Sequence, residues 1–387
     1  MRRSALRPGC TLRWVRGGAK HREVLARLRA LLKRARAPSA GAPCAGGAEG
    51  AGPGGSSRVE ERLEDGGAGE PAFARFARVL GVELPEEAAC VPDEEDAEDA
   101  RLTALVEERF AAARPEPASF PAIALQILNL VASPDAQVSE LARLVSRDPA
   151  LSAGALSVAN SAVYRGVQEF ETVRDAVTRL GLVELGRVAA AVSARTLFSP
   201  RLRAEQAAFG ARWNALFAHA VAVGSAAAAQ ALRQAGARSD RAYLGGLLHD
   251  IGKSLALRAL AGLIADGAVA VPDGARLERV LDRVHVELGA EAHQIWALPQ
   301  YLTVLCVRHH DRAIPADPEF VDLHLVRLTS ALSDLREPAF AARAAAEVVQ
   351  SAGALGLDPY AARAIFADLR QSEVRTGASY ALAPSAR

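Results

Sequence analysis

The fold is decided by the stretch Tyr243-Leu244-Gly245-Gly246-Leu247-Leu248-His249-Asp250-Ile251-Gly252-Lys253. It is an apolar run that ends in an adjacent His-Asp pair, followed by a glycine and a lysine. Imidazole nitrogen and carboxylate oxygen are both ligands for Zn, Mn or Fe. Neighbouring side chains on a helix point about 100° apart, so His249 and Asp250 can reach one ion only near a cavity or a helix end. We expect Gly252 to suit such an end, and Lys253 to place a cation beside any anion held there.

The histidines are concentrated in about a quarter of the chain. Of the eight in the sequence, one is His21, and the others are His219, His249, His285, His293, His309, His310 and His324. This clustering indicates a site. A lone histidine on an apolar helix face is more often a hydrogen-bonded core residue than a ligand, and we expect His293 and His324 to be structural or exposed.

The composition predicts a helical protein. At 387 residues, half of them hydrophobic, the chain can bury a large core in one or two domains. Alanine and leucine abound whereas aromatic residues are scarce, which favours helix over sheet. The formal net charge of +1 excludes a strong global field, so nucleic-acid binding is not expected without a local basic patch.

The cysteines and the hydropathy pattern indicate a cytoplasmic protein. Four cysteines stand far apart, without the spacing of a metal site, at Cys10, Cys44, Cys90 and Cys306. We therefore expect a reducing compartment and no disulfide framework. No apolar run reaches the roughly 18 residues that a transmembrane helix needs, and the basic start is not followed by the apolar segment of a secretion signal.

Residues 1–100 are predicted to form a disordered leader. Residues 1–36 form a basic amphipathic segment that could touch nucleic acid or an anionic membrane surface, with a solvated leader as the alternative. Residues 37–70 are rich in Ala, Gly, Pro and Ser, which is typical of a flexible linker. A short helix from Phe73 to Leu84 precedes an acidic spacer. We expect the leader to be dispensable for the core fold.

Order is predicted to begin with a helix from Leu102 to Ala113. Residues 120–198 are expected to form five short helices. Asp148 is a candidate N-cap before Pro149, and Gly181 is a helix terminator. Beyond the site region, residues 336–371 are expected to form C-terminal helices and residues 372–387 a flexible tail.

Four further helical segments carry the candidate ligands. His219 lies on a long helix over 213–234, and His249 and Asp250 lie on a helix over 241–255. His285 follows on a third helix, and His309-His310 on a fourth. A bundle in which these helices converge could bind one or two metal ions through inward-facing side chains.

A set of short motifs runs through this region in a fixed order. They are Phe120-Pro121, Asp148-Pro149, Ala159-Asn160-Ser161-Ala162, Asp175-Ala176, Leu180-Gly181, Trp213, His219, the stretch 247–253, His285 with Gly289-Ala290, Trp296, Leu298-Pro299 and His309-His310. In this order and spacing the chain closely resembles the HDOD family, a branch of the HD-domain superfamily. The resemblance covers about residues 115–335. It implies an HDOD domain over 101–335, with a helical subdomain at 115–200 and an HD-like bundle at 205–335.

The resemblance also implies a set of metal ligands. The related HD-GYP proteins hydrolyse cyclic di-GMP at a metal centre, and their ligand pattern matches His219, His249, Asp250, His285, His309 and His310. A divalent Mn, Fe or Zn ion is the cofactor so implied. Asp250 would belong to the catalytic centre, and Lys253 would contact a phosphate.

Two departures from that pattern argue against hydrolysis. The superfamily places a closing Asp on a later helix, but the aligned stretch from Leu323 to Ala331 contains none. Asp322 and Asp334 flank it, and either could substitute only after a shift of register. The Gly-Tyr-Pro segment is also missing after His310. Without the closing carboxylate, an ion is expected to bind less tightly.

We therefore expect a bacterial signalling or regulatory protein that acts through contacts with other signalling proteins. Such a protein would lack hydrolase activity, and its metal site could be either working or vestigial. The alternative is a metal-dependent phosphohydrolase that acts on a cyclic dinucleotide or nucleotide through the retained histidines and Asp250.

Overall fold

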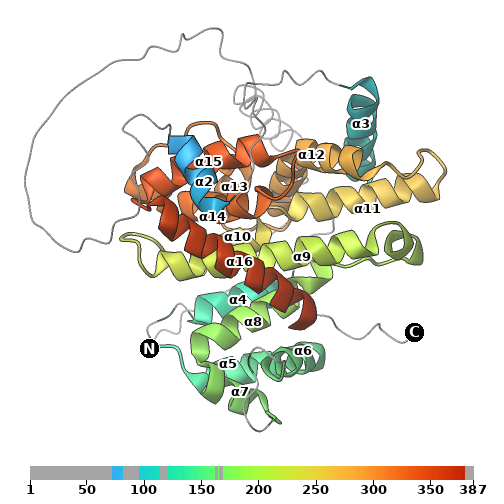
Figure 1. Ribbon diagram of the computed structural model, residues 1–387. Coiled ribbons are helices and arrows are strands. Elements are labelled where there is room, and N and C mark those ends of the chain that lie inside the picture. The colour runs from blue at the N-terminus through green and yellow to red at the C-terminus, as the bar shows by residue number, and fades with distance from the viewer. Residues whose placement is uncertain are drawn as a thin grey trace, which may run out of the picture. The chain divides into compact units, whose positions relative to one another are not determined.

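The computed structural model describes residues 72–81, 96–113, 121–131, 133, 135–161, 164 and 169–379. Within these residues all regular structure is helical, which confirms the predicted all-α fold (Figure 1). The predictions for residues 1–71, for the acidic run up to residue 95 and for residues 380–387 lie outside the described part of the chain. Of the cysteines, only Cys306 is described, and it is buried and free.

The described helices follow one another along the chain in this order: α2 Ala72–Leu80, α3 Ala97–Ala112, α4 Ala122–Val131, α5 Val138–Val145, α6 Pro149–Ala159, α7 Val173–Leu180, α8 Leu182–Ala194, the 3-10 turn η2 Arg195–Phe198, α9 Arg203–Ala231, α10 Ser239–Leu248, α11 Ile251–Ala265, α12 Gly274–Ile295, α13 Gln300–Arg308, the 3-10 turn η3 Pro318–Phe320, α14 Val321–Asp334, α15 Ala341–Ala354 and α16 Pro359–Ser379.

Helices α4 to α8 are the five short helices that the sequence predicts between residues 120 and 198. Their ends follow from local chemistry. Thr172 and Asp175 form a capping box at the start of α7, and Gly181 ends that helix with a φ of 81°. The loop before α7 is braced by Asn160, whose side-chain amide donates to the Phe170 carbonyl and accepts from the Phe170 backbone N–H. Asn160 therefore has a structural role.

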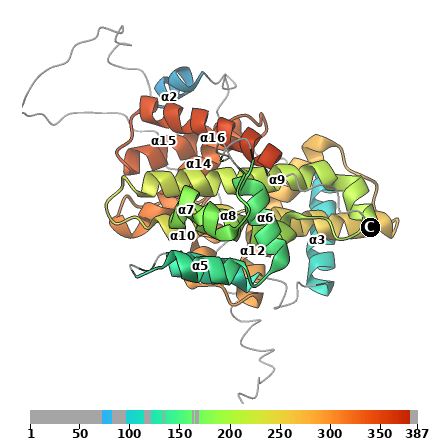
Figure 2. The same cartoon turned by 90° about the horizontal axis from the view of Figure 1, so that it is seen from below.

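Helix α9 runs between the short N-terminal helices and the bundle that carries the site (Figures 1 and 2). Its first half carries Trp213, which is fully buried and donates its indole N–H to Ser254 on α11. Its second half contributes Ala222 and Ala227 to the apolar cluster beneath α14, α15 and α16. Both halves are buried along much of their length, so α9 fixes the position of His219 relative to α10, α11 and α14.

Two glycines of the defining stretch allow helices to approach closely. A Cβ on Gly246 would lie 2.6 Å from the backbone of Gly224, so α10 packs directly against α9. A Cβ on Gly252 would lie 1.9 Å from the carbonyl oxygen of His285 on α12. Gly252 lies in the first turn of α11, so it stands at a helix end as expected. Its role is the contact between α11 and α12.

The described part of the leader packs against the fold, contrary to the prediction that residues 1–100 are disordered. On α2, Phe76 and Leu80 are buried in the same apolar cluster as α15 and α16. Helix α3 begins at Ala97, earlier than predicted. The buried carboxylate of Asp99 accepts hydrogen bonds from Arg276 and Arg279 on α12, so charged contacts extend the helix towards its N-terminus.

The C-terminal helix continues beyond the predicted boundary of the flexible tail. Instead of ending near residue 371, α16 runs to Ser379 (Figure 1). Glu373 accepts a hydrogen bond from Ser333 on α14, and Thr376 is buried. Within the described residues, no helix combines the length and the apolar character needed to cross a membrane.

Replacement of Gly252 by Ala tests the close approach of α11 and α12. We expect the free energy of unfolding to fall by about 3 kcal/mol, because the new methyl group meets backbone that cannot move aside. The control is Gly274→Ala at the start of α12, where a Cβ meets nothing within 4 Å. That variant should match or exceed the wild type in chemical denaturation. Equal stability of the two variants would contradict the packing described.

A candidate metal centre

The His-Asp pair lies at a break between two helices. The sequence predicts one helix over 241–255, but α10 ends at Leu248 and α11 begins at Ile251. His249 keeps helical dihedrals, whereas Asp250 turns out of the helix with φ −105° and ψ 15°. Both side chains therefore face the same interior space, as the prediction of a helix end or cavity requires. The break is what the single-helix prediction missed.

One oxygen of Asp250 faces two histidines from α9 and α10. Oδ2 lies 3.6 Å from Nε2 of His219 and 3.5 Å from Nε2 of His249. The two imidazole Nε2 atoms are 3.4 Å apart. Together these residues form what we call the first triad, whose ligand atoms lie within 4.8 Å of one another.

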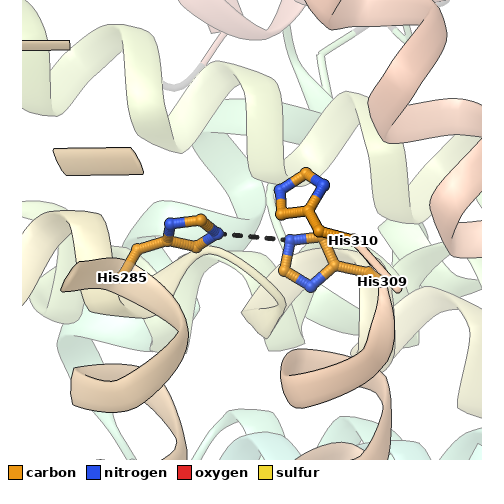
Figure 3. A group of neighbouring side chains, drawn as sticks. All are labelled: His285, His309 and His310. Atoms are coloured by element: carbon orange, nitrogen blue, oxygen red, sulfur yellow. Dashed lines mark hydrogen bonds between the residues drawn. The ribbon is translucent and has the colours of Figure 1, made fainter. Parts of the chain in front are cut away.

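The other oxygen of Asp250 faces a second group of histidines, shown in Figure 3. Oδ1 lies 3.4 Å from Nε2 of His285 on α12 and 3.6 Å from Nε2 of His309. Figure 3 draws these two histidines together with His310. With His310, these two residues form the second triad, again with ligand atoms within 4.8 Å of one another. His309 and His310 both face inward because α13 ends at Arg308 and the chain turns there. The five predicted histidines thus form two groups, one on each side of Asp250.

Three of the imidazoles have a fixed hydrogen position. The Nδ1 atoms of His249, His285 and His309 lie 2.7–2.8 Å from the backbone carbonyls of the residues three positions earlier. A carbonyl can only accept, so each Nδ1 carries the hydrogen. Burial lowers the pKa of His249 to about 4 and that of His285 to about 3, which keeps these two rings neutral at pH 7. Nε2 of each neutral ring then presents a lone pair to the centre.

The second triad brings hydrogen-bond acceptors together without a hydrogen-bond donor between them. Nε2 of His285 and Nε2 of His309 face each other at 3.4 Å, beside Oδ1 of Asp250. Among the described residues, neither this oxygen nor Nε2 of His310 has a hydrogen-bond partner, although both are buried. Burying an acceptor without a hydrogen bond costs folding free energy unless a cation lies beside it. Three imidazole nitrogens and a carboxylate oxygen are a donor set that fits a divalent metal ion.

The first triad differs because the protein already supplies donors there. The ammonium of Lys253 lies 2.5 Å from Oδ2 of Asp250, and the hydroxyl of Ser330 lies 3.1 Å from Nε2 of His249. Burial alone would lower the pKa of Lys253, but the carboxylates of Asp250 and Asp334 outweigh it and raise that pKa. Burial likewise opposes ionisation of Asp250, yet His249 and Lys253 hold its pKa well below the usual value. The predicted phosphate-contacting lysine is therefore engaged with Asp250.

The two acids that could replace the closing Asp lie in different places. Asp322 accepts a hydrogen bond from the backbone of Arg238, at the start of α14 and away from the triads. Asp334, at the other end of α14, lines the cleft beside Lys253, and burial raises its pKa to about 6. Two serines of α14 contact predicted ligands instead: Ser330 contacts His249, and Ser333 contacts His219.

A cleft of about 380 Å³ opens beside the first triad. Among the charged side chains that line it are Arg212, Lys253, Asp334, Arg336 and Glu373. Arg212 is paired with Glu278, and Arg336 with Glu373. The cleft therefore gives access to His219 and Asp250, but its charges of both signs are largely paired within the protein.

Two residues that contact the Nδ1 atoms of the histidines, Glu347 and Ser333, were not predicted from the sequence. The carboxylate of Glu347 on α15 lies 2.9 Å from Nδ1 of His310, and burial raises the pKa of Glu347 to about 7. Ser333 contacts Nδ1 of His219 at 3.0 Å. Glu347 is the one acid in the alanine-rich segment 341–354, which is a weak signal for a buried role. Nothing in the local pattern singles out Ser333.

The remaining histidines and the tryptophans do not join the triads. His324 is buried and lies within hydrogen-bond distance of the Pro315 carbonyl and the Ser351 hydroxyl. His293 is buried on α12. Trp213 and Trp296 belong to the main apolar cluster. His324, Trp213 and Trp296 have the structural roles expected for them, and His293 lies outside both triads.

Comparison with known proteins gives a consistent picture. Residues 118–312, about half of the chain, match the family model of the HDOD domain. An uncharacterized protein of Treponema pallidum (strain Nichols) is 28% identical over 208 residues, which are 51% of this chain but only 38% of that protein.

Two solved structures share the fold. An HDOD domain protein of unknown function from Geobacter sulfurreducens aligns with a TM-score of 0.50 and 23% identity, over 73% of this chain and 97% of that one. A protein from Marinobacter aquaeolei VT8, provisionally assigned to signal transduction, aligns with a TM-score of 0.50 and 20% identity, over 73% of this chain and 69% of that one. At these identities the likeness concerns the fold alone.

Replacement of His309 by Gln tests the metal-binding capacity of the second triad. We expect affinity for Zn or Mn to fall on the order of a hundredfold or more, because a metal-binding nitrogen is lost from an otherwise intact donor set. His324→Gln is the matched control, since His324 is equally buried but outside both triads. Titration of the metal-free proteins against a chromophoric chelator measures the difference. Equal affinities in the two variants would contradict the assignment.

Proposed function

Because the chain belongs to the HDOD domain family, we propose that it is a bacterial regulatory protein of a signalling pathway whose helical bundle holds one divalent metal ion. The observation that carries this proposal is the convergence of buried acceptors on Oδ1 of Asp250. His285, His309 and His310 would hold the ion together with that oxygen. Imidazole-rich sites of this kind suit Zn, Mn or Fe.

The asymmetry of the two triads supports one ion over two. In the second triad no side chain of the described residues donates to Oδ1 of Asp250. In the first triad, the ammonium of Lys253 already neutralises Oδ2, and Ser330 offers a hydroxyl to His249. A second divalent ion there would have to displace or repel the buried lysine. The cation of Lys253 therefore takes the electrostatic role of a second ion.

A single-ion centre favours regulation over phosphodiester hydrolysis. Two neighbouring ions can clamp a phosphate between them, stabilising both the attacking and the leaving oxygen. Here the α14 side chain at His249 is the serine Ser330, and the stretch from Leu323 to Ala331 contains no Asp. In this proposal the bound ion ties together α11, α12 and α13, and the family fold presents a surface to other signalling proteins in the cytoplasm.

Metal-dependent phosphohydrolysis is the second candidate function, and the cleft favours it. The cleft of about 380 Å³ reaches His219, Asp250 and Lys253, and Arg212 and Arg336 also line it. A bound ion could act as a Lewis acid and lower the pKa of a bound water molecule. Lys253 and the arginines would then orient an anionic substrate such as a nucleotide or cyclic dinucleotide.

Metal analysis combined with a hydrolysis assay separates the two candidates. We expect about one ion per chain after reconstitution with Zn or Mn, because Lys253 occupies the first triad. We also expect no hydrolysis of bis(4-nitrophenyl) phosphate or cyclic di-GMP above the level of Asp250→Asn. Asp322→Asn is the control for the loss of an acid, since Asp322 contacts Arg238 away from the triads.

Turnover by the wild type and by Asp322→Asn that disappears in Asp250→Asn would instead establish the hydrolase. A reconstituted wild type without bound metal would overturn both candidates.

A further inference from the structure

Helix α15 touches the outer side of the second triad at two points. The carboxylate of Glu347 lies 2.9 Å from Nδ1 of His310. One turn earlier on the same helix, Arg343 donates to the carboxylate of Asp282 at 2.6 Å. The backbone carbonyl of Asp282 in turn accepts from Nδ1 of His285. Arg343 and Glu347, four residues apart on α15, thus support His285 and His310 on the side away from the centre.

The Nδ1 partner of His310 is a side chain, Glu347, whereas the Nδ1 partners of His285 and His309 are backbone carbonyls. Backbone carbonyls hold Nδ1 of His285 and of His309, so their orientation follows from the helices that carry them. His310 lies just beyond the end of α13, and its Nδ1 contacts a side chain from a helix more than 30 residues further along the sequence. The Nδ1–H of His310 donates to this carboxylate when Nε2 presents its lone pair to the centre.

The surroundings of Glu347 keep its carboxylate in place. Only 4% of its side chain is exposed, and Arg343 lies 3.8 Å from the same oxygen that contacts His310. A carboxylate behind a metal-binding histidine fixes the ring orientation and increases the basicity of the opposite nitrogen. Glu347 and Arg343 both lie beyond residues 118–312, where the family match ends. The family match therefore accounts for the histidine and not for its partner.

We propose that Glu347 is a positioning residue for the metal centre, which directs Nε2 of His310 at the ion, and that α15 is therefore a functional part of that centre. This inference rests on the proposed binding of an ion by the second triad. It concerns the orientation and tautomer of His310, so it also makes a claim about the metal-free protein. Arg343 holds Glu347 and Asp282 in the arrangement that serves both histidines.

The test uses Glu347→Gln in the full chain, because glutamine keeps the size of the side chain and removes the charge. We expect affinity for Zn, measured against a chromophoric chelator, to fall about 10- to 100-fold. Co²⁺, bound in place of Zn, should show an altered visible absorption spectrum in the variant. Glu347→Asp should recover part of the affinity, because the carboxylate is restored on a shorter side chain.

The matched control is Glu373→Gln on α16. Glu373 accepts from Ser333, which contacts Nδ1 of His219, so it stands behind a histidine of the first triad. The same chemical change there should alter Zn affinity less than twofold. Equal losses in both variants would overturn the assignment of Glu347 to the ion-binding triad, as would unchanged affinity and an unchanged Co²⁺ spectrum in Glu347→Gln.

Nitrogen-15 NMR of the histidine rings in the metal-free protein keeps this inference separate from the proposed function. Wild-type His310 should carry its hydrogen on Nδ1, and Glu347→Gln should lose that preference. The opposite tautomer in the wild type would overturn the inference even if metal binds. A wild type that binds no metal but has His310 in the expected tautomer would overturn the proposed function and the role of Glu347 at an ion, and would leave only the orientation of His310 by Glu347.

Discussion

The structure depends on one constraint: each of the two oxygens of a buried carboxylate needs a hydrogen-bond donor or a cation beside it. Asp250 is placed between two groups of imidazoles because the chain breaks at the junction of α10 and α11. Glycines then let the flanking helices come close enough for both groups to reach it, since side chains at Gly246 or Gly252 would strike the neighbouring backbone. The close helix packing at Gly246 and Gly252 therefore also determines the geometry of the site.

The sequence could predict which residues meet, but not how they are held. Histidines on four segments and the His-Asp pair have a recognisable spacing, and the prediction that they converge agrees with the structure. The break at Asp250 escaped prediction because the apolar pattern on both sides is continuous. Glu347 and Ser333 escaped it because a contact between helices far apart in sequence leaves no local periodicity.

The extent of the ordered chain was underestimated for a related reason. Propensity and composition gave no reason to expect α3 to begin at Ala97 or α16 to continue to Ser379. Both ends are held by polar contacts with distant helices, through Asp99 in one case and Glu373 in the other. Such contacts stabilise helix ends that apolar patterning alone would leave frayed.

The two oxygens of Asp250 have different surroundings, and this difference distinguishes the centre from a symmetric two-ion site. A lysine and a serine serve one side, whereas the Nε2 atoms of His285 and His309 face the other oxygen, which has no donor among the described residues. The retained histidines alone therefore do not define a two-ion hydrolase centre. The outer contacts supplied by α15 and α16 lie outside the region that the family match covers.

The most direct test is a crystal structure of the protein soaked in Zn, with anomalous diffraction recorded on both sides of the Zn absorption edge. We expect a single anomalous peak among His285, His309, His310 and Oδ1 of Asp250, with Lys253 still paired with Oδ2. No peak at that position, or a second peak of equal height in the first triad, would contradict this expectation.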